Sequence, residues 1–243
     1  MKRIRNIIML LGAAVLSLPA MADSSLQPHS AVYKVKISVV SGQLRTELKA
    51  AGADFDATHV IRPTGLSRMF SSGRISETSR FLETSDGIRP SEYTSADTIS
   101  RDKTNARVLF DWDSGEARGI VNGEDVYSAM DALAHDRVSI QYALMHDLLN
   151  EGSLDEYTMF EIDKLRKLNV RNIGKKSVKV PAGQFEAVGI QHQAEGSKRV
   201  TTLWCVAELG YLPVIIEQHR LGKLRVRAAL SEYTPAGQSS EIN

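Results

Sequence analysis

The chain has 243 residues, with 30 basic and 29 acidic side chains and a formal net charge of +1. This near-balance argues against nucleic acid as a partner, because surfaces that bind nucleic acid carry a clear basic excess. The sequence has one cysteine, Cys205, which excludes an internal disulfide. Its place in an apolar strand pattern indicates a buried structural thiol. A chain of this length fits one β-rich domain.

The first 22 residues have the pattern of an export signal. Basic residues at positions 2, 3 and 5 precede an apolar run over residues 7–18, and Ala20-Met21-Ala22 forms a small-x-small cleavage site. The apolar run is too short to span a bilayer, and no later stretch reaches the roughly 20 residues that a transmembrane helix needs. We therefore expect cleavage after Ala22 and a periplasmic protein without a transmembrane anchor.

A first series of strands follows the signal. Tyr33, Val35 and Ile37 alternate with Lys34 and Lys36, and this period of two predicts a half-buried strand. Turn signals at positions 42, 85–87, 100–105, 113–115 and 122–123 separate the strand-like segments that come after it. These segments lie at residues 44–48, 55–61, 74–83, 88–96, 107–112 and 117–121.

The alternation breaks over residues 63–73. Here turn residues surround the apolar Leu66, Met69 and Phe70, which predicts a loop or one short helical turn. Glycines at positions 65 and 73 flank this tip. Its apolar side chains need cover, either from the protein's own core or from a bound molecule.

The stretch from Asp136 to Asn150 predicts the one long helix. At about 100° per residue, the apolar residues form a stripe wider than half the circumference, and a small polar wedge remains. Asp136 is a candidate N-cap and Gly152 a candidate C-terminal stop. The stripe contains Val138, Ile140, Tyr142, Leu144, Met145, Leu148 and Leu149, and the wedge contains Ser139, His146, Asp147 and Asn150. An apolar face this wide suits a helix in the concavity of a sheet.

A second series of strands is expected after the helix, at residues 157–166, 168–173, 178–180, 185–191, 200–207, 214–221 and 224–233. Spacings of about 8–12 residues between turn signals point to an antiparallel meander. The predicted fold is mainly β: an antiparallel β-roll or open curved barrel, with one principal α-helix packed on the concave face. It forms a single domain over residues 23–235, followed by a flexible tail at 236–243.

Catalytic and metal-binding patterns are weak in this sequence. The His135-Asp136 and His146-Asp147 pairs are similar to those of metal-dependent phosphohydrolases, but such sites need several helices and this chain has one. No phosphate-binding loop, dinucleotide fingerprint, serine elbow or zincin helix is present. We therefore expect no metal, no cofactor and no catalytic set. The basic run Lys164 to Lys179 is interpreted as a solvated hairpin, or alternatively as a patch for anionic headgroups or envelope sugars.

Several short motifs in a fixed order resemble an exported bacterial family, domain of unknown function 3108. They are Thr64-Gly65-Leu66, Gly73, Gly87-Ile88-Arg89-Pro90, Tyr93, Asp136-x-x-Ser139, Pro181-Ala182-Gly183-x-Phe185, Trp204 and Leu212-Pro213-Val214. One departure is Arg137, where the resemblance leads us to expect proline. The resemblance implies a periplasmic, β-rich, single-domain protein without an assigned activity, and it supplies no catalytic residues.

Three functions remain open from the sequence. The first is a non-catalytic envelope protein that binds a lipid or another amphiphile in the concavity, and the alternative for the same residues is that they simply fill the core. The candidate lining is Leu66, Met69, Phe70, Tyr142, Met145 and Leu149. The second is a scaffold that pairs an envelope protein with an exposed strand edge. A hydrolase is third, because no acid–base–nucleophile set is visible.

Overall fold

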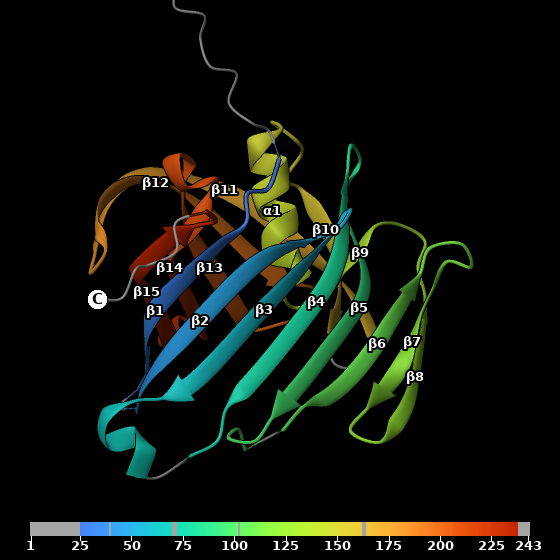
Figure 1. The fold of residues 1–243 in the computed structure, drawn as a ribbon, viewed down its shortest axis with the longest axis horizontal. Helices are drawn as coiled ribbons and strands as arrows, with labels where there is room; N and C mark the ends of the chain where they lie inside the picture. Colours follow the sequence, from blue (N-terminus) through green and yellow to red (C-terminus); the bar gives the residue numbers. More distant parts are fainter. Residues whose placement is uncertain (1–24, 39, 70–71, 102, 162–163, 238–243) are drawn as a thin grey trace, which may run out of the picture.

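The structure is a computed structural model that describes residues 25–38, 40–69, 72–101, 103–161 and 164–237. This part of the chain forms fifteen strands, one α-helix and two short 3-10 helices (Figure 1). Their bounds are β1 His29–Ile37, β2 Val40–Ala51, β3 Asp54–Pro63, η1 Gly65–Met69, β4 Ile75–Thr84, β5 Gly87–Asp97, β6 Asn105–Asp111, β7 Glu116–Val121, β8 Glu124–Ala129, β9 Ala134–His135, α1 Ser139–Leu149, β10 Glu156–Glu161, β11 Lys164–Val180, β12 Gly183–Ala194, β13 Arg199–Val206, η2 Ala207–Leu209, β14 Leu212–Arg220 and β15 Lys223–Pro235.

All fifteen strands belong to one sheet, in the order β8-β7-β6-β5-β4-β3-β2-β1-β15-β14-β13-β12-β11-β10-β9. The first and last strands, β1 and β15, pair antiparallel in the middle of the sheet. Neighbours elsewhere in the described sheet are also antiparallel, apart from β9 and β10, which are parallel. The predicted antiparallel meander is confirmed.

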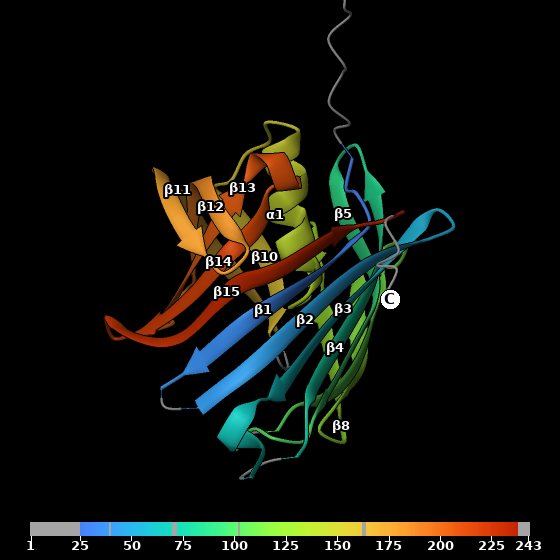
Figure 2. The same cartoon turned by 60° about the vertical axis from the view of Figure 1, so that its left-hand side comes forward.

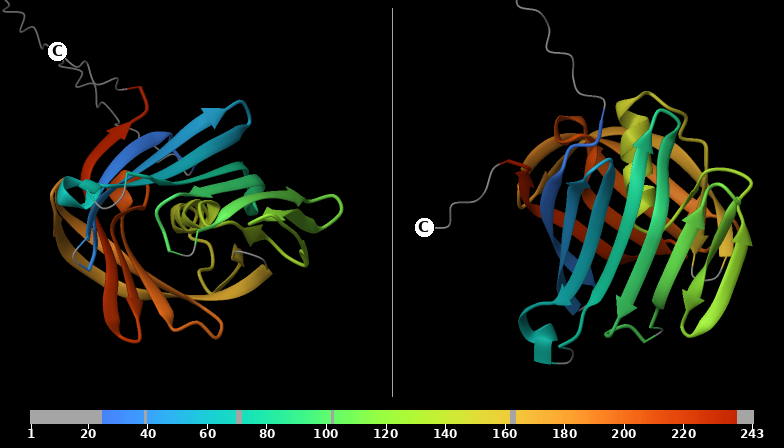
Figure 3. Two further views of the ribbon diagram at one scale, coloured as in Figure 1. Left: turned by 90° about the horizontal axis from the view of Figure 1, so that it is seen from below. Right: turned by 45° about the vertical axis from the view of Figure 1, so that its right-hand side comes forward.

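The sheet is strongly curved but does not close into a barrel, since β8 and β9 remain as its two edges. Seen from below, it curls around α1, which lies on the concave side (Figure 3, left). Figure 2 shows β1 and β15 running side by side along the outside of this curl. Bulges place one extra residue in each of β15, β5 and β14, at Ser231, Ser91 and Val214, and bulges of this kind bend the strand that carries them. The predicted open curved barrel with one helix on its concave face is confirmed.

Helix α1 begins at Ser139, three residues after its predicted start at Asp136. Asp136 nevertheless caps the helix, because its Oδ1 accepts bonds from the backbone N–H groups of Val138 and Ser139 at 2.8 and 2.9 Å. In return, the Ser139 hydroxyl oxygen accepts the Asp136 N–H at 2.9 Å, which is the reciprocal pattern of a capping box. At the other end the Gly152 N–H donates to the Asp147 carbonyl at 2.7 Å, so the predicted stop is in place.

Two residues of the polar wedge predicted for this helix are buried, whereas Asp147 is half-buried and Asn150 is exposed. Ser139 is fully buried and His146 is only 6 % exposed, so the prediction of a solvent-facing histidine is wrong. The reason is the curl of the sheet, which brings β4, β5 and β9 into contact with α1. His146 Nδ1 lies 3.1 Å from Asp147 Oδ1, which provides a polar partner inside the core.

Several strand boundaries also differ from the predictions. β8 and β9 were not expected, and Asn122-Gly123 is the turn between β7 and β8 and not the end of the series. Gly42 lies inside β2 and makes no turn. The predicted strands at 168–173 and 178–180 are parts of the single strand β11, because an irregularity between Asn172 and Lys175 includes Gly174 at φ +96° and lets pairing with β12 continue.

Candidate functional site

A cavity of about 290 Å³ lies on the concave face, between α1 and the inner sides of β3, β4 and β10 to β14. This volume lies just below the range of about 300–1,000 Å³ that is typical of small-molecule sites. Its apolar wall contains Ile140, Leu144, Met159, Leu168, Ala194, Leu203 and Ile216. Its polar wall contains His59, Glu77, Arg137, Gln141, Glu161, His192, Gln193, Ser197, Arg199, Thr201 and Gln218.

The character of the lining changes between successive inward positions on β13 and β14. Leu203 pairs with Ile216 across β13 and β14, and two residues away Thr201 pairs with Gln218. Both pairs point to the same side of the sheet because side chains repeat with a period of two. The cavity therefore changes from apolar to polar along the strand direction.

Three charged side chains of the polar wall, Glu77, Arg137 and Glu161, have partners of opposite charge. Arg137 Nε lies 3.3 Å from Glu77 Oε1, and the Tyr93 hydroxyl donates to the same oxygen at 2.7 Å. Glu77 is only 8 % exposed, so this carboxylate needs both partners. Glu161 has a partner of its own, since Arg166 Nε lies 3.2 Å from its Oε2. Although burial lowers the pKa of Arg137, Glu77 and Glu161 help to raise it above its usual value.

Two histidines on the polar wall are neutral. Burial lowers the pKa of His59 to about 4, against an opposing effect of Glu77. Burial also lowers the pKa of His192 to about 4. A neutral imidazole offers one hydrogen-bond donor and one acceptor. Together with Gln141 and Gln218, these rings can form hydrogen bonds with the hydroxyl or amide groups of a bound molecule.

Five of the six predicted lining residues are described by the structure, and none of these five lines the cavity. Tyr142 and Met145 are buried and belong to the hydrophobic core, and Leu149 packs against that core. Tyr142 faces Phe81, with ring centroids 5.3 Å apart. None of these three lines the cavity; α1 contributes Ile140, Gln141 and Leu144 to it instead.

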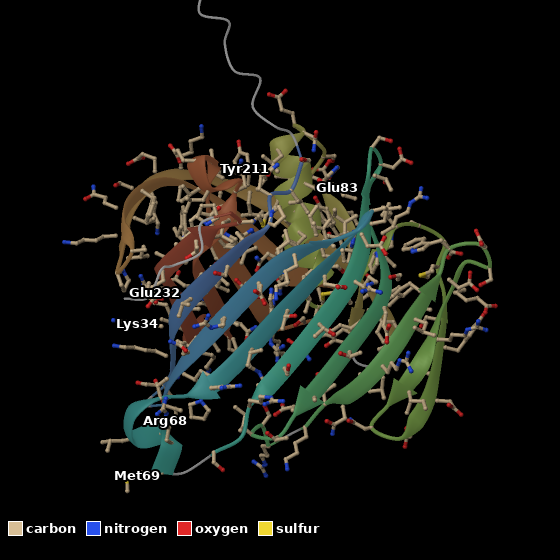
Figure 4. All side chains as sticks on the ribbon, in the orientation of Figure 1. Lys34, Arg68, Met69, Glu83, Tyr211 and Glu232 are labelled. Atoms are coloured by element: carbon tan, nitrogen blue, oxygen red, sulfur yellow. The ribbon has the colours of Figure 1, made fainter. Side chains whose placement is uncertain are left out.

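The apolar tip is also separate from the cavity. Leu66 and Met69 are 77 % and 79 % exposed, and Met69 projects from η1 at the bottom left of Figure 4, far from α1. The predicted meeting of this tip with the helix is therefore wrong for these two residues. Phe70 lies outside the described residues.

Sequence reasoning missed the central polar pair of the cavity. Glu77 sits in β4 among alternating Ser and Thr residues, and nothing in that pattern indicates an inward carboxylate. Arg137 is the position where the family resemblance leads us to expect proline. That departure was the available signal, because an unexpected arginine at the start of a buried helix needs an acidic partner.

The two His-Asp pairs do not form a metal centre. The Tyr157 hydroxyl donates to Asp147, which also faces His146. His135 is buried against Tyr157, with ring centroids 6.0 Å apart. Within the described ranges, no group of three or more His, Cys, Asp or Glu side chains is arranged to hold a metal ion.

The basic run on β11 is largely engaged within the fold. Lys167 Nζ lies 2.8 Å from Glu156, and Arg171 donates to Gln191 at 2.9 Å. Lys176 Nζ lies 3.7 Å from the centroid of the Trp204 ring, a cation–π contact. These contacts favour the interpretation of this run as a solvated hairpin.

The fold and the cavity define a class: a β-barrel-like protein whose open curved sheet surrounds one helix. The chain belongs to the family described as "Protein of unknown function (DUF3108)", whose model matches residues 30–226. No curated protein matches the chain. No helix in the described ranges combines the length and the apolar composition needed to cross a membrane.

Two solved structures show where the fold recurs. A beta-barrel-like protein of domain of unknown function DUF1849 from Brucella abortus is 11 % identical, with a TM-score of 0.58 over 88 % of this chain and 99 % of that chain. At this identity the likeness concerns the fold only. The structure of MucB is 8 % identical, with a TM-score of 0.33 over 88 % of this chain and 55 % of that chain, and it supports no argument here.

Proposed function

We propose that this protein is an exported, non-catalytic envelope protein that binds a small amphiphile in the cavity beside α1. The observation that carries the proposal is the mixed lining of the cavity, in which the apolar pair Leu203 and Ile216 lies next to the polar pair Thr201 and Gln218. An amphiphile satisfies both walls at once, whereas a purely apolar guest leaves the buried polar groups without partners. Export rests on the signal pattern in residues 1–22.

A titration tests the binding. The probes are monodecanoylglycerol, which is uncharged, and decanoate, which is anionic; binding is followed by calorimetry. We expect saturable binding of one molecule per chain for at least one probe. Native mass spectrometry of the protein from the cell envelope should show a co-purifying species of matching class.

A pair of variants controls this experiment. Ala194 lines the cavity, so Ala194→Trp fills space that the guest needs and should abolish binding. Ala129 is exposed on the edge strand β8, so Ala129→Trp should bind as the wild type does. Both variants must keep the wild-type circular dichroism spectrum. If neither probe saturates and nothing co-purifies, the carrier function is wrong.

The location has a separate test. The envelope form should begin at Asp23 when its N-terminus is sequenced. A full-length chain recovered from the cytoplasm contradicts export and the periplasmic location with it.

A scaffold function is the second candidate, and the free edge of β8 favours it. β8 has a strand partner on one side, β7, and its Tyr127 is 62 % exposed. An edge of this kind accepts an added strand. A photo-crosslinking residue at position 127 should then capture one envelope protein that the same residue at the exposed Leu82 does not. Identical capture at both positions argues against a specific edge.

A further inference from the structure

Four turns lie together at the end of the sheet where β1 and β3 finish and β2 and β4 begin. We name this surface the basic rim and define it as residues 36–38 and 40, 62–69 and 72–75, 195–199, and 219–225. Pairing connects the turns: Arg199 lies opposite Arg220, and Arg220 opposite Lys223. β15 then leads to β1, where Val226 pairs with Ile37.

Hydrogen bonds join η1 to the same surface. The Thr64 N–H donates to the Ser41 carbonyl at 3.0 Å, and the Ser67 hydroxyl oxygen accepts the Ser41 N–H at 3.0 Å. The short helix is therefore held against the start of β2. Figure 4 shows its Arg68 and Met69 projecting from the bottom of the molecule.

The rim carries large apolar side chains that no part of the described chain covers. Their exposed fractions run from 44 % to 79 %. They come from three of the four turns: Leu66, Met69 and Leu221 lie in η1 and the β14–β15 turn, and the other three lie at the adjoining strand ends. They are Ile37, Val40, Leu66, Met69, Leu221 and Leu224.

Charge on the rim is strongly one-sided. Its ranges contain nine basic residues and one acidic residue, Glu195, although the whole chain has a net charge of only +1. All nine basic residues are exposed, and no ion pair joins any of them to an acidic side chain within the described ranges. Arg199 and Arg220 even face one another across strands, an arrangement that destabilises a sheet.

We infer that the basic rim docks on an anionic lipid bilayer, with its cations among the headgroups and its apolar tips at the acyl boundary. Exposed leucine and methionine tips beside lysine and arginine are the combination that interfacial binding requires. A second copy of the chain is a poor occupant, because two such rims repel each other.

The position of the rim relates it to the cavity. Ser197 and Arg199 belong to the turn between β12 and β13 and also line the cavity, so a docked rim brings one side of the cavity to the bilayer. Docking goes beyond the proposed carrier function and does not depend on it. The Ala194→Trp variant, with a filled cavity, should dock as the wild type does.

Vesicle sedimentation tests the docking. The protein is used as purified from expressing cells, with its N-terminus checked by mass spectrometry. Vesicles of equal parts phosphatidylglycerol and phosphatidylcholine are compared with phosphatidylcholine alone. Each basic side chain near an anionic surface strengthens partitioning about fivefold, so we expect a preference of more than tenfold for the anionic vesicles. Raising the salt from 0.05 to 0.5 M should weaken it.

Variants locate the contact. Arg220→Glu with Lys223→Glu should lower the partition coefficient at least tenfold. The matched reversal of the exposed Lys175 and Lys179, which lie on β11 outside the rim, should change it less than threefold. Leu66→Asp with Met69→Asp should also lower it at least tenfold.

Three outcomes overturn the inference. The first is wild-type binding that does not distinguish the two vesicles. The second is an equal loss from both charge reversals, which indicates attraction by overall charge. The third is full binding by the Leu66→Asp, Met69→Asp variant, which indicates attraction by charge alone, without the apolar contact that the inference requires.

Discussion

Acidification from pH 7 to pH 5 should destabilise the fold through three histidines that burial keeps neutral. Burial lowers the pKa of His59, His135 and His192 from 6.5 to about 4. The unfolded chain therefore takes up protons before the folded protein does. The stability that these groups contribute is fully present above pH 6.5 and is lost as the pH falls toward 4.

The magnitude follows from the linkage relation. At pH 5 each of the three histidines should lower the free energy of unfolding by about 2 kcal/mol relative to pH 7. Asp136 acts in the opposite direction, since burial raises its pKa from 3.8 to about 6. The folded protein binds this proton before the unfolded chain does. Protonation of Asp136 therefore raises the free energy of unfolding by about 1 kcal/mol as the pH falls through 6. The net loss is about 4 kcal/mol, which is a large part of the whole stability of many domains.

Urea unfolding at the two pH values measures this loss. His135 is the sharpest site for a variant, because it is 3 % exposed. His135→Gln should shrink the loss between pH 7 and pH 5 by about 2 kcal/mol, whatever it does to stability at pH 7. The control Ala129→Gln changes an exposed, non-titrating position on β8 and should leave the loss unchanged. Equal free energies of unfolding at pH 7 and pH 5 refute the reasoning.

Three further predictions concern packing and capping, each read from denaturant melts. Asp136→Ala removes the helix cap and should cost about 1–2 kcal/mol; an unchanged midpoint contradicts the capping role. Gly189→Ala places a Cβ 2.6 Å from Ile173 Cγ1 and 2.8 Å from the Trp204 ring, so it should cost about 1–3 kcal/mol, with partial recovery when Ile173→Ala is added. Leu144→Ala should cost about 2–5 kcal/mol, and the buried His146→Ala about 1–3 kcal/mol; a cost near zero at either site places that side chain outside the core.

The sequence predicts the architecture well because its signals are local. Alternation such as that of Tyr33, Val35 and Ile37 reports a half-buried strand directly, and the apolar stripe of residues 138–149 reports a helix against a sheet. These signals come from the residues of the core. Their burial follows from the strand or helix periodicity of the sequence, and it does not depend on which distant strands pair.

The site is harder to predict because it depends on register between distant strands. Glu77, Arg137 and Gln218 meet only after β4, the start of α1 and β14 have taken their places in the curl. For α1, a stripe wider than half the circumference shows that most of the helix is buried. It does not show which part faces a cavity. The sequence therefore predicts Tyr142 as a lining residue, whereas in the structure Gln141 and Leu144 line the cavity.

The prediction that Leu66 and Met69 line the concavity is wrong for a related reason. Apolar residues between glycines look like a segment that needs cover, and the sequence pattern assigned that cover to the concavity. The register of β2 with β3 instead places Leu66 and Met69 at the end of the sheet, where nothing in the described chain reaches them.

The pairing of β1 with β15 has a consequence for how the chain reaches its native state. The Ser231 hydroxyl donates to the Val32 carbonyl across a separation of 199 residues, so the middle of the sheet forms only after nearly the whole chain is available. Such high contact order slows folding, because the entropy of closing a long loop is lost before the stabilising contacts form.

A circular permutant removes that delay. Near the chain ends the Ala236 N–H donates to the Pro28 carbonyl at 2.9 Å, so a short linker can join them. New termini between β8 and β9 fall at the two free edges of the sheet. Every antiparallel pair in the permuted chain then joins strands that are consecutive in sequence, and refolding should be faster while the cavity and the basic rim keep their geometry.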